Sequence, residues 1–248
     1  MYFIGIDLAW SEKNDSCIST FQEDEFIEYK FLKTNEEIVR YINSFDNGKI
    51  VAIDAPLIVK NKTGLRRCEK DLVKFFRRYK IGVHATNLNR LKTYGGERCL
   101  QLAKMFEKYG YANTPNITRN DKINAIIEVY PHPAIVSIFN LKERLKYKSK
   151  FDREIRLKNL DLYSKLILSL ANRDPCIKVP KDILNKNLEN LKTSELKRYE
   201  DLLDSIICAY IAKLFWYYPE KCIVFGDDST GYIITPSPEA GKSILSFL

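Results

Sequence analysis

Residues 2–7 read Tyr-Phe-Ile-Gly-Ile-Asp, a continuous apolar run that ends on a carboxylate. Such a run is too short for a stable helix and is typical of a strand that is buried on both faces within a sheet. Residues 49–54 (Lys-Ile-Val-Ala-Ile-Asp) and 125–130 (Ala-Ile-Ile-Glu-Val-Tyr) repeat the pattern. The sequence therefore predicts three inner strands, and each of them carries one acid: Asp7, Asp54 and Glu128.

The segments around these strands alternate between extended and helical patterns. Two β-rich segments, 16–21 and 26–32, form a meander with the first strand. No internal repeat or low-complexity linker divides the chain, so we predict one α/β domain over residues 1–248, with a helical insertion around 60–120 and extra C-terminal strands. The other expected elements are helices within 34–46, 64–79, 97–109, 152–171 and 194–217, a long loop at 80–97, and short strands at 222–225 and 231–235.

The composition is that of a soluble globular protein, with 45% hydrophobic and 29% charged residues among 248. Forty Lys and Arg residues against thirty-two Asp and Glu give a net charge of +8, which favours contact with polyanions such as nucleic acid. Basic residues gather in segments 60–80 and 141–165. These segments either bind phosphates or are solvated faces of lysine-rich helices.

Cysteine and histidine usage argues against a structural zinc site. The six cysteines form no C-x-x-C pair, and the two histidines, His84 and His132, are far apart in sequence. Scattered thiols and an N-terminus without a secretory signal indicate a cytoplasmic protein. The most apolar stretch, 205–216, contains Lys213 and is far shorter than the roughly 20 residues that cross a bilayer, so no membrane partner is expected.

The acids on the inner strands require a compensating partner such as a metal ion, because burying an unpaired carboxylate is costly. In the late helix, Asp201 and Asp204 are three residues apart and share a face that can meet the sheet. Oxygen ligands suit Mg²⁺ or Mn²⁺, and such ions can activate water for phosphodiester cleavage. The alternative to metal binding is that Asp7 and Asp54 cap the following turn or helix at a strand end and that Asp201 is an exposed helix acid. The candidate metal ligands are Asp7, Asp54, Glu128, Asp201 and Asp204, and the candidate catalytic residues are Asp7, Asp54, Glu128 and Asp204.

Five motifs follow one another along nearly the whole chain: Gly5-Ile-Asp7-Leu-Ala-Trp10, Ile53-Asp54-Ala-Pro-Leu57, Glu128-Val-Tyr-Pro-His-Pro133, Asp201-Leu-Leu-Asp204-Ser-Ile-Ile-Cys-Ala209, and Gly226-Asp227 with Gly231-Tyr-Ile-Ile-Thr-Pro236. In this order they resemble the domain-of-unknown-function family 429 (DUF429), described as predicted nucleases of the ribonuclease-H-like fold. The helix motif around Asp204 is also similar to the last metal-binding helix of RuvC-type resolvases. Ser205 stands where such helices more often have alanine.

The resemblance implies a ribonuclease-H-like α/β fold with a five-stranded mixed sheet in the order 3-2-1-4-5, flanked by helices. It places Asp7 on the first strand, Asp54 on the fourth and Asp204 on the final helix as ligands of Mg²⁺ or Mn²⁺. Glu128 would lie on the fifth strand, either as a ligand or as an acid that orients water or substrate.

Basic residues near these acids could hold the phosphates of a nucleic acid. Tyr147 could stack on a base, and His132 could assist proton transfer, although a histidine between two prolines is more often structural. Arg66 and Lys148 resemble positions kept in the family pattern. The candidate phosphate-binding residues are Arg66, Arg67, Lys70, Lys146, Lys148, Arg153 and Arg156.

The function predicted from these features is hydrolysis of nucleic-acid phosphodiester bonds by a carboxylate-bound divalent metal, with DNA and RNA both possible substrates. One alternative is a non-catalytic binder of nucleic acid or protein on the same fold. Another is an ATP-dependent phosphotransferase of the actin and sugar-kinase type. It is disfavoured because Leu8-Ala-Trp10 follows Asp7 where a glycine-rich phosphate-binding turn would be needed.

Overall fold

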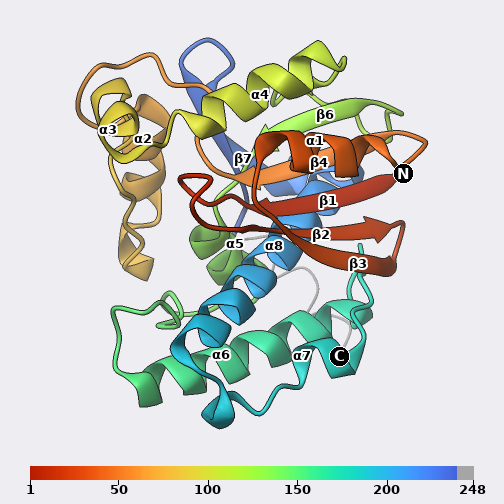
Figure 1. Ribbon diagram of the computed structural model, residues 1–248, viewed down its shortest axis with the longest axis vertical. Coiled ribbons are helices and arrows are strands. Elements are labelled where there is room, and N and C mark those ends of the chain that lie inside the picture. Colours follow the sequence, from red (N-terminus) through yellow and green to blue (C-terminus); the bar gives the residue numbers. More distant parts are fainter. Residues whose placement is uncertain (239–248) are drawn as a thin grey trace.

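The computed structural model describes residues 1–238, in which six strands form one mixed sheet with the order β3-β2-β1-β4-β6-β5 (Figure 1). Strand β2 is antiparallel to β1 and to β3, whereas β4, β6 and β5 run parallel to β1. The predicted α/β class and the order 3-2-1-4-5 are confirmed, with β6 as the expected fifth strand and a two-residue β5 added at the edge. The strands are β1 (Tyr2–Asp7), β2 (Ser16–Gln22), β3 (Glu25–Leu32), β4 (Lys49–Asp54), β5 (Ala112–Asn113) and β6 (Asn124–Glu128).

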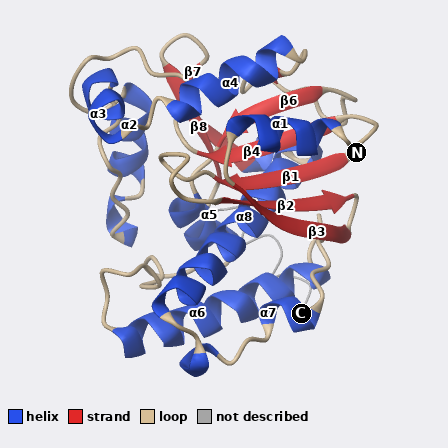
Figure 2. Cartoon of the chain, in the orientation of Figure 1, coloured by secondary structure: helices blue, strands red, loops and turns tan. Residues whose placement is uncertain are grey.

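Helices cover both faces of the sheet (Figure 2). Strand side chains alternate in direction, so Ile4 and Ile6 of β1 pack with α1 and α4, whereas Phe3 packs in the separate core that contains α5, α6 and α8. The apolar composition of the inner strands follows from this coverage. The helices are α1 (Asn35–Asn43), α2 (Arg67–Phe75), α3 (Leu88–Tyr94), α4 (Arg98–Lys108), α5 (Pro131–Ile138), α6 (Arg153–Leu168), α7 (Lys181–Leu184) and α8 (Thr193–Tyr217).

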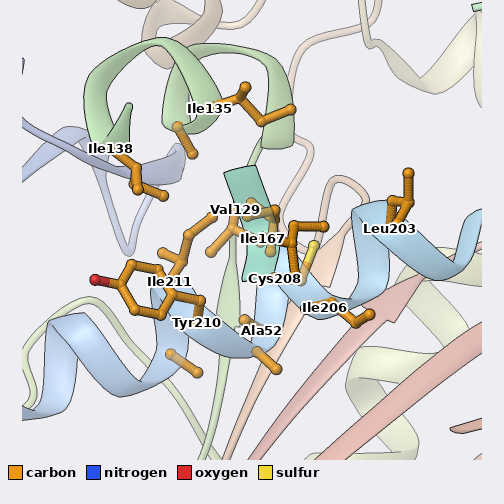
Figure 3. Packing of buried hydrophobic residues seen from close by; sticks show 14 of the residues in the cluster. Ala52, Val129, Ile135, Ile138, Ile167, Leu203, Ile206, Cys208, Tyr210 and Ile211 are labelled. Atoms are coloured by element: carbon orange, nitrogen blue, oxygen red, sulfur yellow. The ribbon is translucent and has the colours of Figure 1, made fainter. Parts of the chain in front are cut away.

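Helix α8 crosses β1, β2 and β4, and it supplies much of the larger core. Its backbone approaches β1 so closely that a Cβ atom on Gly5 would lie 1.9 Å from the carbonyl oxygen of Ser205. The Ser205 hydroxyl makes a buried 2.6 Å hydrogen bond with Ser19 of β2, which accounts for a serine at this position of the helix. Figure 3 shows the side chains that fill this core from β4, α5, α6 and α8, among them Ala52, Ile135, Ile167, Ile206 and Ile211.

Three helices differ from the expectations, and one of them is the four-residue α7, which the sequence did not predict. The segment 80–97, expected as a loop, contains α3, whose N-terminus is capped by the Asn87 side chain accepting the Arg90 N–H at 3.0 Å. Helix α5 begins at Pro131, where the sequence was expected only to end a strand. A proline is tolerated there because N–H groups in the first helical turn have no intrahelical partner.

The C-terminal strands β7 (Cys222–Asp227) and β8 (Gly231–Pro236) pair as a separate two-stranded antiparallel sheet, as expected for short terminal strands. This hairpin packs on α2 and on α5. None of the helices within residues 1–238 combines the length and the apolar composition needed to cross a membrane.

Candidate functional site

A cleft of about 1010 Å³ opens at the carboxyl ends of β1 and β4. Asp7 and Asp54 are the last residues of these two strands and stand opposite each other in the parallel register. Strand β1 pairs with the parallel strand β4 on one side and with the antiparallel strand β2 on the other. The connections that leave the carboxyl ends of β1 and β4 therefore diverge. Ligands of open α/β sheets bind at such a position, outside the carboxyl ends of the strands.

Asp204 reaches the same cleft from α8 and is held by three donors. The hydroxyls of Tyr147 and Tyr163 both donate to Oδ1 at 2.9 Å, and the ammonium of Lys148 donates to Oδ2 at 2.7 Å. Burial opposes ionisation of Asp204, but the charge of Lys148 and these hydrogen bonds lower the pKa of the carboxyl below its usual value. Asp204 is therefore an ionised group in a fixed orientation.

Asp7 and Asp54 have much less compensation. Burial and the nearby acids Asp201 and Asp204 raise the pKa of Asp7 well above its usual value. Burial and the charge of Asp204 raise the pKa of Asp54 to about 7. Oδ2 of Asp7 is buried and has no hydrogen-bond partner among residues 1–238. The floor of the cleft thus holds two carboxyl groups whose ionised forms the protein leaves largely uncompensated, so that a bound cation would favour their ionisation.

The other predicted helix acid, Asp201, lies one turn from Asp204 at the wall of the cleft. It pairs with Lys197, and Lys197 is also 3.3 Å from Glu200. Glu200 is buried and further paired with Lys148 at 3.1 Å and with Arg156 at 3.1 Å. Asp201 therefore belongs to a network of alternating charges, whereas Asp7 and Asp54 do not.

The donor set at the floor of the cleft fits a hard divalent cation. Oxygen is the ligand type that Mg²⁺ and Mn²⁺ prefer, and the unpartnered Asp7 Oδ2 supplies one such oxygen. As the side chains stand in residues 1–238, no group of three or more Asp, Glu, His or Cys residues is arranged to enclose an ion. The Lys148 ammonium, bridging Asp204 and Glu200, provides positive charge at this position instead.

In the structure, Glu128 and Arg66, predicted as a metal ligand and a phosphate-binding residue, form an ion pair with each other. The guanidinium of Arg66 makes two hydrogen bonds to the Glu128 carboxylate, Nη1 to Oε2 at 2.9 Å and Nη2 to Oε1 at 2.5 Å. The N–H of Leu57 also donates to Glu128 Oε2, and Glu69 accepts from Arg66 Nε at 2.9 Å. Arg66 is only 4% exposed. Both side chains border the cleft, and their charged groups are bonded to each other.

The variant Arg66→Met is expected to lower the free energy of unfolding by about 3–5 kcal/mol, because removing one partner leaves the other charge buried and unpaired. Chemical denaturation measures this loss. Arg67→Met is the matched control, since the exposed side chain of Arg67 pairs with Asp71 at 3.7 Å. Equal effects of the two variants would contradict this role, and adding Glu128→Leu to Arg66→Met should recover most of the loss.

Most of the other predicted phosphate-binding residues lie outside the cleft. Arg156 is buried against Glu200 and the Tyr147 carbonyl, and Arg153 donates to the carbonyls of Glu189 and Leu191. Lys148 is the predicted cation that reaches the acids. Three further predicted residues do not line the cleft: Arg67, Lys70 and Lys146.

The predicted base-stacking and proton-transfer residues are also constrained. Tyr147 is fully buried and bonded to Asp204, so its ring cannot take a base. His132 lines the cleft, and its Nδ1 is buried without a hydrogen-bond partner. Burial and the charge of Lys148 lower the pKa of His132 to about 3, so the ring is neutral at physiological pH.

Besides Lys197 and Arg198, which pair with carboxylates, sequence reasoning missed three cations that line the cleft: Lys13, Arg144 and Lys150. None of the three forms an ion pair with a carboxylate of residues 1–238. Lys13 comes from the β1–β2 loop, and the other two come from the loop before α6. A signal was available for Arg144 and Lys150, which flank Lys148 in a basic segment, but Lys13 lies in a loop of mixed charge.

Comparisons with known proteins agree with the motif order. The family described as "Protein of unknown function (DUF429)" matches residues 5–230, which include all of the strands from β1 to β7 except the first three residues of β1. No curated protein and no solved structure matches the chain. Because the match covers most of the sequence, the chain belongs to the DUF429 family.

Proposed function

We propose that this protein is a divalent-metal-dependent phosphodiesterase that cleaves nucleic acid. The observation that carries the proposal is the pair Asp7 and Asp54, whose ionised forms lack compensation, beside the ionised Asp204 at the floor of one cleft. A phosphodiester is itself anionic, so acids in a substrate cleft favour its binding only when a cation lies between them.

Asp7, Asp54 and Asp204 are the residues that would hold Mg²⁺ or Mn²⁺. When bound, such an ion polarises a phosphoryl oxygen and lowers the pKa of water. The chain itself supplies orientation. Tyr147 and Tyr163 fix the Asp204 carboxylate, and the register of β1 with β4 keeps Asp7 beside Asp54. Such supporting hydrogen bonds keep ligand carboxylates in a productive position.

The cations at the rim support a polyanionic substrate. Lys13, Arg144 and Lys150 line the cleft without carboxylate partners in the described part of the chain, so their charges remain available for phosphates. Phosphate contacts position a nucleic acid and make its binding dependent on salt. We therefore assign phosphate binding to these three residues in place of Arg66, Arg153 and Arg156.

The test is a cleavage assay on a panel of labelled DNA and RNA structures with Mg²⁺, with Mn²⁺ and with EDTA. We expect cleavage that requires the metal and stops on chelation. Salt-dependent binding without metal-dependent cleavage would replace the proposal with a non-catalytic binder. Absence of divalent-metal binding in calorimetry would contradict the assignment of the three acids.

Lys148→Met is expected to tighten Mn²⁺ binding by about tenfold or more, because two unit charges about 4 Å apart interact with roughly 4 kcal/mol near a protein surface. The Lys148 ammonium donates to Asp204 Oδ2 and would therefore compete with a metal ion for this carboxylate. Calorimetric titration measures the change. Lys158→Met removes an exposed ammonium paired with Glu154 on α6 and should leave the affinity unchanged. Weaker Mn²⁺ binding in Lys148→Met would show that this lysine supports the metal site.

A further inference from the structure

Trp10 is an exposed aromatic side chain in the wall of the candidate site. It lies three residues after Asp7, lines the same cleft as the acids, and is 47% exposed. The other tryptophan, Trp216, is 8% exposed and donates its indole N–H to the Asp121 carbonyl. The two tryptophans thus have opposite environments, and only Trp10 presents its ring to the cleft.

The backbone that carries Trp10 is held rigidly, although the side chain is exposed. Arg98, itself 4% exposed, donates from Nη1 to the carbonyls of Ala9 at 3.1 Å and Ser11 at 3.3 Å, the residues on either side of Trp10. Its Nη2 donates to the Lys33 carbonyl at 2.8 Å. A buried guanidinium bonded to both flanking carbonyls fixes the position from which the indole projects.

The indole ring is also supported from one side. Gly96, in the turn between α3 and α4, has no Cβ, and an added Cβ would lie 2.5 Å from Cε3 and 2.7 Å from Cζ3 of Trp10. The six-membered ring therefore rests on the bare backbone of this glycine. Exposed aromatic rings that are fixed in this way lose little conformational freedom on binding a flat partner.

We infer that Trp10 is a stacking platform for an unpaired nucleobase, so that the substrate class is single-stranded nucleic acid or a strand with an unpaired base next to the phosphate at the acids. The inference rests on the proposed function for the phosphate, but the stacking contact itself requires no cleavage. Lys13, three residues further along the same loop, supplies a cation for the neighbouring phosphate. Aromatic platforms beside basic residues bind single strands because every base has a π face, whereas pairing and stacking hide those faces in a duplex.

Tryptophan fluorescence tests the contact directly in the Asp7→Asn protein, in which cleavage is not expected. The probes are a short oligodeoxyadenylate, the matching oligoriboadenylate and a fully paired blunt hairpin. We expect both single strands, or one of them, to quench the emission of Trp10, and the hairpin to leave it unchanged. Adding Trp10→Leu should remove the quenching and weaken single-strand binding by roughly 5- to 150-fold, the range found when base–aromatic stacking is lost.

Trp10→Phe keeps an aromatic face and should retain part of the affinity. Tyr109→Leu is the control, since it removes an aromatic ring that is 63% exposed outside the cleft. Single strands that do not bind, or that bind without quenching Trp10, would overturn the inference, as would equal affinity of the Trp10→Leu and parent proteins. Quenching without cleavage by the wild type would support the platform and refute the nuclease. Metal-dependent cleavage that is insensitive to Trp10→Leu would support the nuclease and refute the platform.

Discussion

Asp7→Asn is expected to abolish metal-dependent cleavage, lowering the rate by about 1,000-fold or more, since metal ions contribute several kcal/mol to transition-state stabilisation and roughly 1.4 kcal/mol corresponds to tenfold in rate. Asparagine has nearly the same shape as aspartate but lacks its charge. The change therefore removes the carboxylate whose Oδ2 has no partner in the described part of the chain.

The same variant should fold at least as well as the wild type in the absence of divalent cations. Burial and the neighbouring acids raise the pKa of Asp7, which means that its ionised form is disfavoured in the folded protein. Removing the charge relieves this cost. A site that is destabilising on its own and needed for activity is common in enzymes.

Thermal unfolding with and without Mn²⁺, together with the cleavage assay, checks both halves of this expectation. Mn²⁺ should raise the unfolding temperature of the wild type and have much less effect on Asp7→Asn, because a ligand stabilises only the state that binds it. Asp161→Asn is the control, since Asp161 is an exposed acid of α6 paired with Lys165. Wild-type turnover in Asp7→Asn would refute the catalytic assignment.

Gly5→Ala is expected to destabilise the protein by more than about 4 kcal/mol, a loss that single substitutions reach only through severe defects such as core overpacking. The new Cβ would lie 1.9 Å from the Ser205 oxygen, 2.2 Å from the Ala209 nitrogen and 2.9 Å from the Cys208 carbonyl carbon. These are backbone atoms of α8, so no rotamer change can relieve the overlap. The helix would have to move away from β1 and take Asp204 with it.

Chemical denaturation and the yield of folded protein measure this effect. Gly82→Ala is the matched control, because a Cβ there would meet nothing within 4 Å and the residue does not have a positive φ. We expect Gly82→Ala to change stability by less than about 0.5 kcal/mol. A Gly5→Ala protein as stable as Gly82→Ala would show that α8 does not approach β1 as closely as described.

Local patterns were sufficient to predict the sheet. The apolar runs at 2–7, 49–54 and 125–130 became β1, β4 and β6, because a strand buried on both faces has little freedom in composition. The motif order led to the correct family and to the strand order. Helix α3 was missed because its seven residues are too few to show clear periodicity, and α5 was missed because its first turn contains two prolines.

The placement of Asp7, Asp54 and Asp204 at one cleft could also be anticipated, since two acids end parallel neighbouring strands and the third lies on the helix that crosses them. Which of these acids is paired with a cation, and which is not, could not be anticipated from the sequence. Glu128 and Asp54 look alike in the sequence, each an acid on an apolar strand, yet Glu128 has the guanidinium of Arg66 bonded to it, whereas burial and the charge of Asp204 raise the pKa of Asp54 to about 7.

The difference between these acids has a general physical cause. Strand formation depends on side chains close together in sequence, which is why periodicity and motif order were enough for the fold and for the edge of the sheet that holds the acids. Neutralisation of a buried charge depends on which cation lies within a few ångströms, because Coulomb energies rise steeply with proximity in a poorly solvated interior. Arg66 is 62 residues from Glu128, and Lys148 is 56 residues from Asp204, so only the folded chain selects these pairs.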